Sequence, residues 1–204
     1  MTDQSTRDKI LKISHKLFSE KGFTGVSVRE IAKLSQCNIA AINYHFQNKE
    51  NLYVETVKQS IARTESEIKT IYENLGDNKN IDLFTNEVLE HFKEHNEDLR
   101  TGFKMLLTQY NSDSLQFDFS KYRGPPGGEY FDLCLKHHFP HAKNEDVEWA
   151  VRTLFTQVIH KSLLLCNKGL CSNILEHDDI ETVFYNDIKR LLQLIKRELS
   201  QKTD

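Results

Sequence analysis

The residues best suited to chemistry lie between positions 38 and 49, where hydrogen-bonding side chains alternate with small ones. If Ile39, Ile42 and Phe46 form the inward face of a helix, the outward residues are Ala40, Ala41, Asn43, Tyr44 and His45. A carboxamide can pair with adenine, phenol and imidazole groups can donate to phosphates or base edges, and alanines allow close approach to a groove. This set of groups is suited to contacts with double-stranded DNA.

Local signals define the helices that would position these groups. Gly22 is placed to end a first amphipathic helix, and Ser27 with Glu30 forms a capping box that begins a second one. Asn38 is a good N-cap for the third helix, and Asn48 for a longer fourth one in which Lys49 could meet a phosphate. Two short helices joined by a tight turn predict a helix-turn-helix DNA-binding domain in residues 1–50.

Charge is distributed unevenly along the 204 residues. Residues 1–50 carry eight basic and five acidic side chains, a net charge of +3, whereas the whole chain carries −3. The remainder is therefore acidic, so any contact with nucleic acid depends on a local basic patch and not on the net charge. The composition, with 38% hydrophobic residues, 8 Gly and 3 Pro, excludes collagen-like and low-complexity chains.

Here the sequence resembles the TetR/AcrR family of bacterial transcriptional regulators. The matching segments are Arg7 to Phe23 with its Ile10-Leu11 and Lys21-Gly22-Phe23, Ser27 to Ala32, and Ile42 to Leu52. One departure is Gln36, which stands where the family usually has Gly in the turn; a left-handed non-Gly residue costs on the order of 1 kcal/mol. The predicted DNA-binding residues are Ser27, Val28, Arg29, Asn38, Ala40, Ala41, Asn43, Tyr44, His45 and Lys49.

Residues 51–204 also show helical periodicity and no strand-like alternation, so the predicted fold is all-α. The predicted helices span residues 48–75, 81–99, 101–111, 129–138, 144–167 and 179–199. The resemblance implies that this part binds a small effector and pairs two subunits through the last two helices. The expected effector-pocket residues are Phe84, Val88, Phe92, Phe103, Leu107, Phe117, Phe119, Tyr122, Tyr130, Phe131 and Phe155. The expected dimer-interface residues are Trp149, Leu154, Val158, Phe184, Ile188, Leu191, Leu192 and Ile195. The alternative for both sets is ordinary packing inside one subunit.

Other functional classes find little support in the sequence. No G-x-S-x-G, phosphate-binding loop, H-E-x-x-H or paired Glu-x-x-His motif occurs, so neither an enzyme nor a cofactor is expected. His91 and His95 lie four residues apart and His137, His138 and His141 cluster, yet two ligands do not close a zinc site. Four cysteines without a C-x-x-C pair, and no signal or membrane segment, favour reduced thiols in a cytoplasmic protein.

The sequence thus predicts a homodimeric repressor that binds a palindromic operator and is released by an unidentified small molecule. Such a ligand would have to favour the conformation in which the two recognition helices no longer match successive major grooves. Two alternatives are the same DNA-binding domain without a small-molecule effector, controlled by a partner or constitutive, and a helical metal-binding protein or enzyme.

Overall fold

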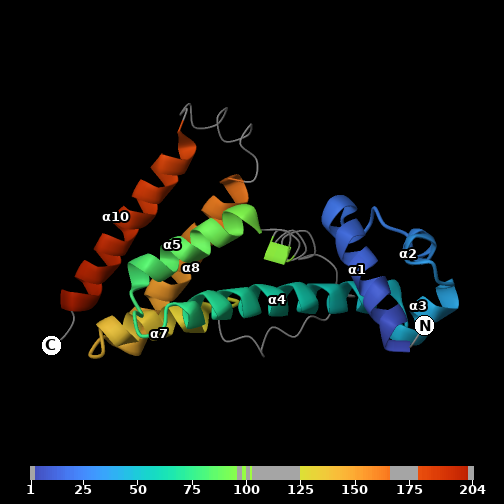
Figure 1. Ribbon diagram of the computed structural model, residues 1–204, viewed down its shortest axis with the longest axis horizontal. Coiled ribbons are helices and arrows are strands. Elements are labelled where there is room, and N and C mark those ends of the chain that lie inside the picture. Colours follow the sequence, from blue (N-terminus) through green and yellow to red (C-terminus); the bar gives the residue numbers. More distant parts are fainter. Residues whose placement is uncertain (1–2, 96–97, 100–101, 103–124, 166–178, 202–204) are drawn as a thin grey trace. The chain divides into compact units, whose positions relative to one another are not determined.

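The computed structural model describes residues 3–95, 98–99, 102, 125–165 and 179–201, and every element in these ranges is an α-helix (Figure 1). This confirms the predicted all-α class. The chain divides into two compact units, residues 1–63 with 97–121 and residues 64–96 with 122–204. The helices are α1 (Asp3–Lys21), α2 (Val28–Ser35), α3 (Ile39–Phe46), α4 (Lys49–Asn74), α5 (Ile81–Glu94), α7 (Gly128–His138), α8 (Asn144–Leu165) and α10 (Ile180–Gln201).

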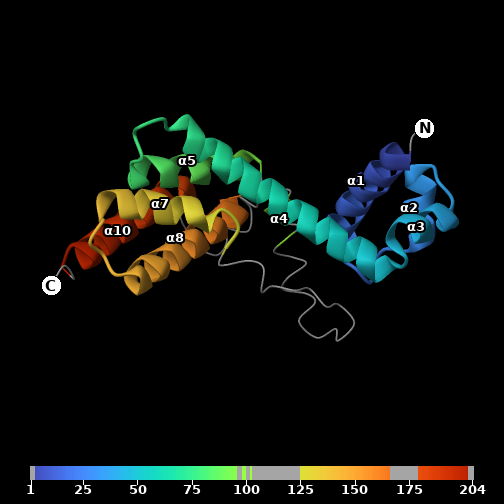
Figure 2. The ribbon, with the colours of Figure 1, turned by 90° about the horizontal axis from the view of Figure 1, so that it is seen from below.

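The first unit contains α1, α2, α3 and the beginning of α4, which lie together in both ribbon views (Figures 1 and 2). Its core forms where the apolar stripes of these helices meet, with Ile10, Ile31 and Ile42 fully buried. Tyr53 of α4 packs edge-on against Phe18 of α1, with ring centroids 4.9 Å apart. Apolar burial of this kind fixes the short helices, which would be marginal alone.

The second unit contains the later part of α4 with α5, α7, α8 and α10. Helix α8 packs against α5, α7 and α10, and α10 also contacts α5. Its buried core includes Phe84, Phe131, Leu154 and Ile188. Gly127, at φ +72°, begins α7 against Ile68, where a Cβ atom would lie 2.7 Å from the isoleucine Cδ1.

Ion pairs add to the attachment of α10 within this unit. The Lys161 ammonium of α8 is buried and lies 2.7 Å from Asp187 Oδ2, while Lys93 of α5 contacts Glu181 at 3.1 Å. Helix α5 ends at Glu94, five residues before the predicted end, and most of the predicted helix 101–111 lies outside the described residues. None of the described helices is long and apolar enough to cross a membrane.

Candidate nucleic-acid interface

Capping side chains and one left-handed residue build the turn between α2 and α3. Ser27 Oγ accepts a hydrogen bond from the Glu30 N–H at 3.1 Å, and Asn38 Oδ1 accepts one from Ala41 N–H at 2.7 Å. Gln36 adopts φ 54° and ψ 41°, and the Cys37 N–H that follows donates to the Ala32 carbonyl at 3.0 Å. The predicted caps are therefore confirmed, and Gln36 occupies the left-handed conformation that favours glycine.

The second half of the predicted capping box is wrong. The Glu30 carboxylate accepts a hydrogen bond from Lys21 Nζ at the end of α1, and does not turn back to the Ser27 backbone. This contact raises the pKa of Lys21, through the hydrogen bond first and then the charge of Glu30. The carboxylate thus links the ends of α1 and α2 instead of closing the helix on itself.

Helix α3 has only a narrow buried face. Ile42 and Phe46 are buried as predicted, but Ile39 is 40% exposed, so its predicted inward position is wrong. Ile39 is the first residue of α3, one turn before Ile42, where little of the domain covers the helix. Tyr44 is 75% exposed and lies edge-on to His45, with ring centroids 5.1 Å apart.

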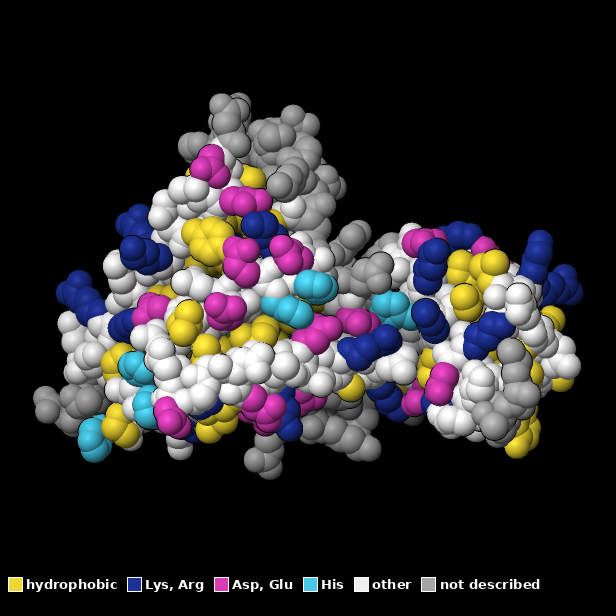
Figure 3. Space-filling model, viewed as in Figure 1, with side chains coloured by type: hydrophobic (Ala, Val, Ile, Leu, Met, Phe, Trp, Pro, Cys, Tyr) yellow, Lys and Arg dark blue, Asp and Glu magenta, His cyan; other side chains and the backbone are white. Residues whose placement is uncertain are grey.

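The structure gathers the predicted DNA-binding residues on α3 and the ends of the adjacent helices. The exposed ones are Ser27, Arg29, Asn38, Ala40, Asn43 and Tyr44, and the half-buried ones are Val28, Ala41, His45 and Lys49. Lys12, Lys16 and Lys33 are also exposed in this unit. On the face that Figure 3 shows, Lys and Arg side chains are interspersed with Asp and Glu. Exposed donors and cations together provide the groups that phosphates and base edges require.

A two-residue joint connects α3 to α4. Gln47 has φ 68° and ψ −53°, and the Asn48 N–H donates to the Phe46 carbonyl at 2.8 Å, which closes a γ-turn. Asn48 Oδ1 then accepts a hydrogen bond from the Asn51 N–H at 2.7 Å and caps α4 as predicted. The two residues that connect α3 to α4 are therefore both fixed by hydrogen bonds.

Two basic side chains fix this joint to the rest of the unit. Lys49 Nζ lies 4.2 Å from the centroid of the Phe23 ring, and burial lowers the pKa of Lys49. The Arg7 guanidinium lies 5.2 Å from the Phe46 ring and 3.2 Å from Glu55 Oε2. Arg7 was part of the motif in the sequence, but its contact with the last residue of α3 could not be predicted from spacing, because 39 positions separate them.

The expected effector-pocket residues that the structure describes are packed against one another. Phe84 and Phe131 have ring centroids 4.7 Å apart, and Phe131 lies 6.4 Å from Phe155. Val88 and Phe92 are fully buried, and burial raises the pKa of Tyr130 to about 12. Phe103, Leu107, Phe117, Phe119 and Tyr122 lie outside the described residues.

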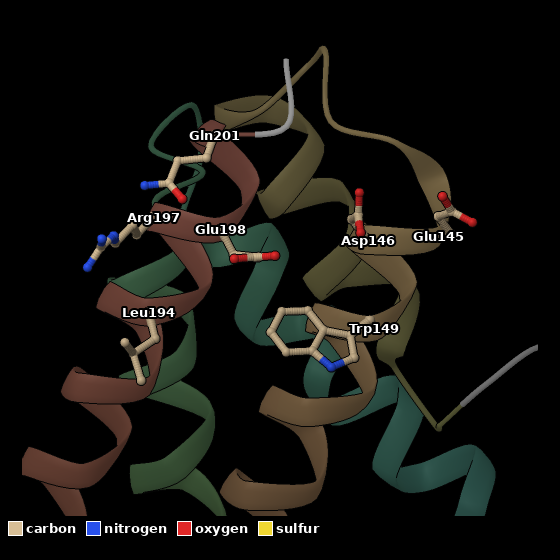
Figure 4. Close-up of a pocket in the computed structure, with 7 residues that line it drawn as sticks. All are labelled: Glu145, Asp146, Trp149, Leu194, Arg197, Glu198 and Gln201. Atoms are coloured by element: carbon tan, nitrogen blue, oxygen red, sulfur yellow. The ribbon is translucent and has the colours of Figure 1, made fainter. Parts of the chain in front are cut away.

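Most of the expected dimer-interface residues are already buried in the single chain. Six of them pack within the second unit and have little surface to give to a second copy: Leu154, Val158, Phe184, Ile188, Leu192 and Ile195. Leu191 is half-buried, and Trp149 is 42% exposed. Trp149 lies with Leu194, which is 55% exposed and which the sequence analysis missed, in a groove of about 780 Å³ between α8 and α10 (Figure 4). The other groove residues are Glu145, Asp146, Arg197, Glu198 and Gln201.

The histidines make local contacts. The rings of His91 and His95 stack with centroids 4.9 Å apart, and His91 Nε2 lies 3.3 Å from Glu67 Oε2. Among the described residues, no group of three or more His, Cys, Asp or Glu side chains is arranged to hold a metal ion.

Comparisons with known proteins agree with this geometry. Residues 10–56 match the model of bacterial regulatory proteins of the tetR family. The chain is 39% identical over 71 residues to the "Probable HTH-type transcriptional regulator YttP" of Bacillus subtilis, covering 35% of this chain and 34% of that protein. It is 40% identical over 57 residues to the HTH-type transcriptional repressor NicS of Pseudomonas putida, covering 28% of this chain and 27% of NicS.

The fold extends beyond these matches. A transcriptional regulator of the TetR/AcrR family from Aquifex aeolicus superposes with a TM-score of 0.58 at 22% identity, covering 93% of this chain and 99% of that one. The matches to YttP and NicS span about a third or less of each relative. The first unit is thus a helix-turn-helix domain. Its residues 10–56 match the tetR family of bacterial regulatory proteins, which confirms the resemblance seen in the sequence.

Proposed function

We propose that the chain is a transcriptional regulator whose α3 enters the major groove of DNA. The observation that carries this proposal is the exposed face of α3, the second helix of the helix-turn-helix, on which Asn43 and Tyr44 present hydrogen-bonding groups. The Asn43 carboxamide is suited to pairing with adenine, and the Tyr44 hydroxyl and the Lys49 ammonium are suited to contacting phosphates. The similarity of residues 10–56 to the tetR family supports this assignment.

We further propose that two copies bind a palindromic operator and repress transcription. A dimer places two recognition helices about 35 Å apart, one turn of DNA, and combines their individual affinities. The exposed Trp149 and Leu194 on adjacent helices α8 and α10 supply an apolar surface for the second copy (Figure 4). NicS, which matches the first part of this chain, is a repressor.

Release by a small molecule completes the proposal, with the family resemblance as its support. The ligand would bind in the second unit and act through α4, which begins beside the recognition helix and continues into that unit. It must bind more tightly to the conformation in which the two recognition helices do not match successive major grooves. A ligand with equal affinity for this and the DNA-binding conformation would not shift the equilibrium between them. The tight ring packing of Phe84, Phe131 and Phe155 favours the second candidate, a regulator that responds to a partner or to none.

Fluorescence anisotropy tests the DNA-binding function. The full chain would be titrated against DNA from upstream of its own coding region and against scrambled DNA, over a series of salt concentrations. We expect specific binding that Tyr44→Ala weakens and that Leu83→Ala, a change at an exposed leucine of α5, leaves unchanged. If neither this DNA nor any fragment selected from the genome binds specifically, the proposed function is wrong.

A further inference from the structure

The exposed position of Ile39 gives α3 an apolar side chain that is accessible for contact with a base. Ile39 is the first residue of α3 and is 40% exposed, and the adjacent Ala40 is exposed as well. The Asn38 cap fixes this first turn through its 2.7 Å hydrogen bond with the Ala41 N–H. The N-terminal residues of a recognition helix are the ones that contact base edges. Methyl-bearing side chains are therefore held where bases are read.

The rest of α3 restricts which bases these are. Its sequence, IAAINYHF, contains no Arg or Lys, the residues that most often recognise guanine through two hydrogen bonds. The exposed residues of its first two turns are Ile39, Ala40, Asn43 and Tyr44, and the proposed function assigns the Tyr44 hydroxyl to a phosphate. Apolar side chains pair with the thymine C5 methyl group, and asparagine pairs with adenine N6 and N7. Both preferences are met by the same base pair, A·T.

We infer that α3 selects A·T base pairs and that Ile39 contacts the C5 methyl group of a thymine in each half-site. The inference rests on the proposed function and deepens it, because it names the base chemistry that the helix recognises. Asn43 reads adenine one turn further along α3, so the two residues follow the same groove. A side chain facing the core, as the periodicity of α3 predicts for Ile39, would have no such role.

The test removes one methyl group at a time from the DNA. The full chain first selects its preferred duplex from random sequences, and each thymine of one half-site is then replaced by deoxyuridine, which lacks only the C5 methyl. At one thymine we expect affinity to fall about four-fold, the contribution of one buried methyl-sized group. Ile39→Ala should lose this sensitivity at that thymine, while Leu34→Ala, a change at an exposed leucine of α2, should retain it.

Each outcome decides a different claim. Loss of the methyl effect in Ile39→Ala alone, within an A·T-rich half-site, supports the inference. A specific site that is G·C-rich at the α3 contacts, or one in which no thymine methyl is coupled to Ile39, overturns the inference and leaves the proposed function intact. Failure of the unmodified chain to select any sequence overturns the proposed function itself. Thermal melting of both variants shows that they fold.

Discussion

His15 Nε2 of α1 lies 2.8 Å from Asp98 Oδ1, an ion-pair distance between residues 83 positions apart. Arg63 Nε of α4 approaches the same oxygen to 3.3 Å, so one carboxylate contacts two basic groups within the first unit. His15 is buried in the chain and Asp98 is half-buried. Their contact joins α1 to residue 98, which follows α5 in the chain.

Removing this carboxylate should destabilise the first unit. We expect Asp98→Ala to lower the free energy of unfolding by about 2 kcal/mol, since a basic group would be left buried without its partner. Glu73→Ala, which breaks an exposed pair with Lys69 at 3.7 Å, should cost less than about 0.5 kcal/mol. Urea unfolding of the two variants measures the difference. Equal, small losses would show that the cluster around Asp98 contributes little.

The left-handed conformation of Gln36 makes a prediction about the turn before α3. Gln36→Gly should raise the free energy of unfolding by about 0.5 kcal/mol, because relief of strain slightly exceeds the greater chain entropy of glycine when unfolded. Gln36→Val should lower it by more than about 1 kcal/mol, since a branched Cβ tolerates positive φ poorly. Thermal melts should rank the proteins Gly, Gln, Val; the reverse order would contradict the φ of 54°.

Lys49 should contribute a cationic contact to DNA binding. Its ammonium group lies against Phe23 at the beginning of α4, beside the capped N-terminus. We expect Lys49→Gln to reduce the dependence of log K on log salt concentration by about 0.9, the effect of one lost phosphate contact. Lys189→Gln, at an exposed lysine of α10, serves as the control and should leave the slope unchanged. An unaltered slope in Lys49→Gln would place Lys49 outside the interface.

The groove at Trp149 should be covered in the proposed dimer. Leu194→Glu would bury two carboxylates, one per copy, in a two-fold interface, and we expect its dissociation constant to rise at least about a hundred-fold. The control is Leu133→Glu, a change at a similarly exposed leucine of α7, which should leave the dimer unchanged. Sedimentation equilibrium distinguishes the two. A Leu194→Glu protein that stays dimeric would exclude this groove from the interface.

Because Cys134 is buried, its thiol should react slowly, and its contribution to the stability of the folded chain should fall at high pH. Desolvation raises the pKa of its thiol from 9.0 to about 12, so at pH 8 iodoacetamide should modify the half-buried Cys37 far faster. Between pH 9 and 12 the unfolded chain loses the Cys134 proton while the folded chain keeps it, so stability falls as pH rises. Cys134→Ala should show a shallower fall. Peptide mass mapping and unfolding curves provide the two measurements.

Local signals in the sequence were sufficient for the N-caps of α2, α3 and α4 but not for the packing of helix faces. Ser27, Asn38 and Asn48 were predicted as caps because a cap depends on residues only two or three positions away. Ile39 was misplaced because periodicity defines the direction of a helix face and not how far neighbouring elements extend over it. Leu154 lies on an apolar stripe that matches either a second subunit or α5 and α10 of its own chain.

Contacts between residues far apart in the sequence could not be predicted from the spacing of residue types. His15 and Asp98 are joined by the fold alone: His15 lies within the family-like segment, but Asp98 lies 83 positions further along the chain. Leu194 was missed because the interface of α10 was predicted from the apolar residues that recur at helical spacing. Leu194 lies outside this stripe, on the exposed side of the helix. The candidate DNA-binding surface was easier to identify because it is built from one short, continuous segment.

The γ-turn at Gln47 limits which mutations the segment between α3 and α4 can accept during evolution. Each residue inserted into a helix turns the following part by about 100° and advances it by about 1.5 Å. Because Gln47 and Asn48 are both held by hydrogen bonds, this joint cannot absorb an added or missing residue. One extra residue would therefore turn Tyr44 away from its present face relative to Lys49. We expect sequence drift between these two positions to proceed by substitution, with insertions and deletions eliminated by selection.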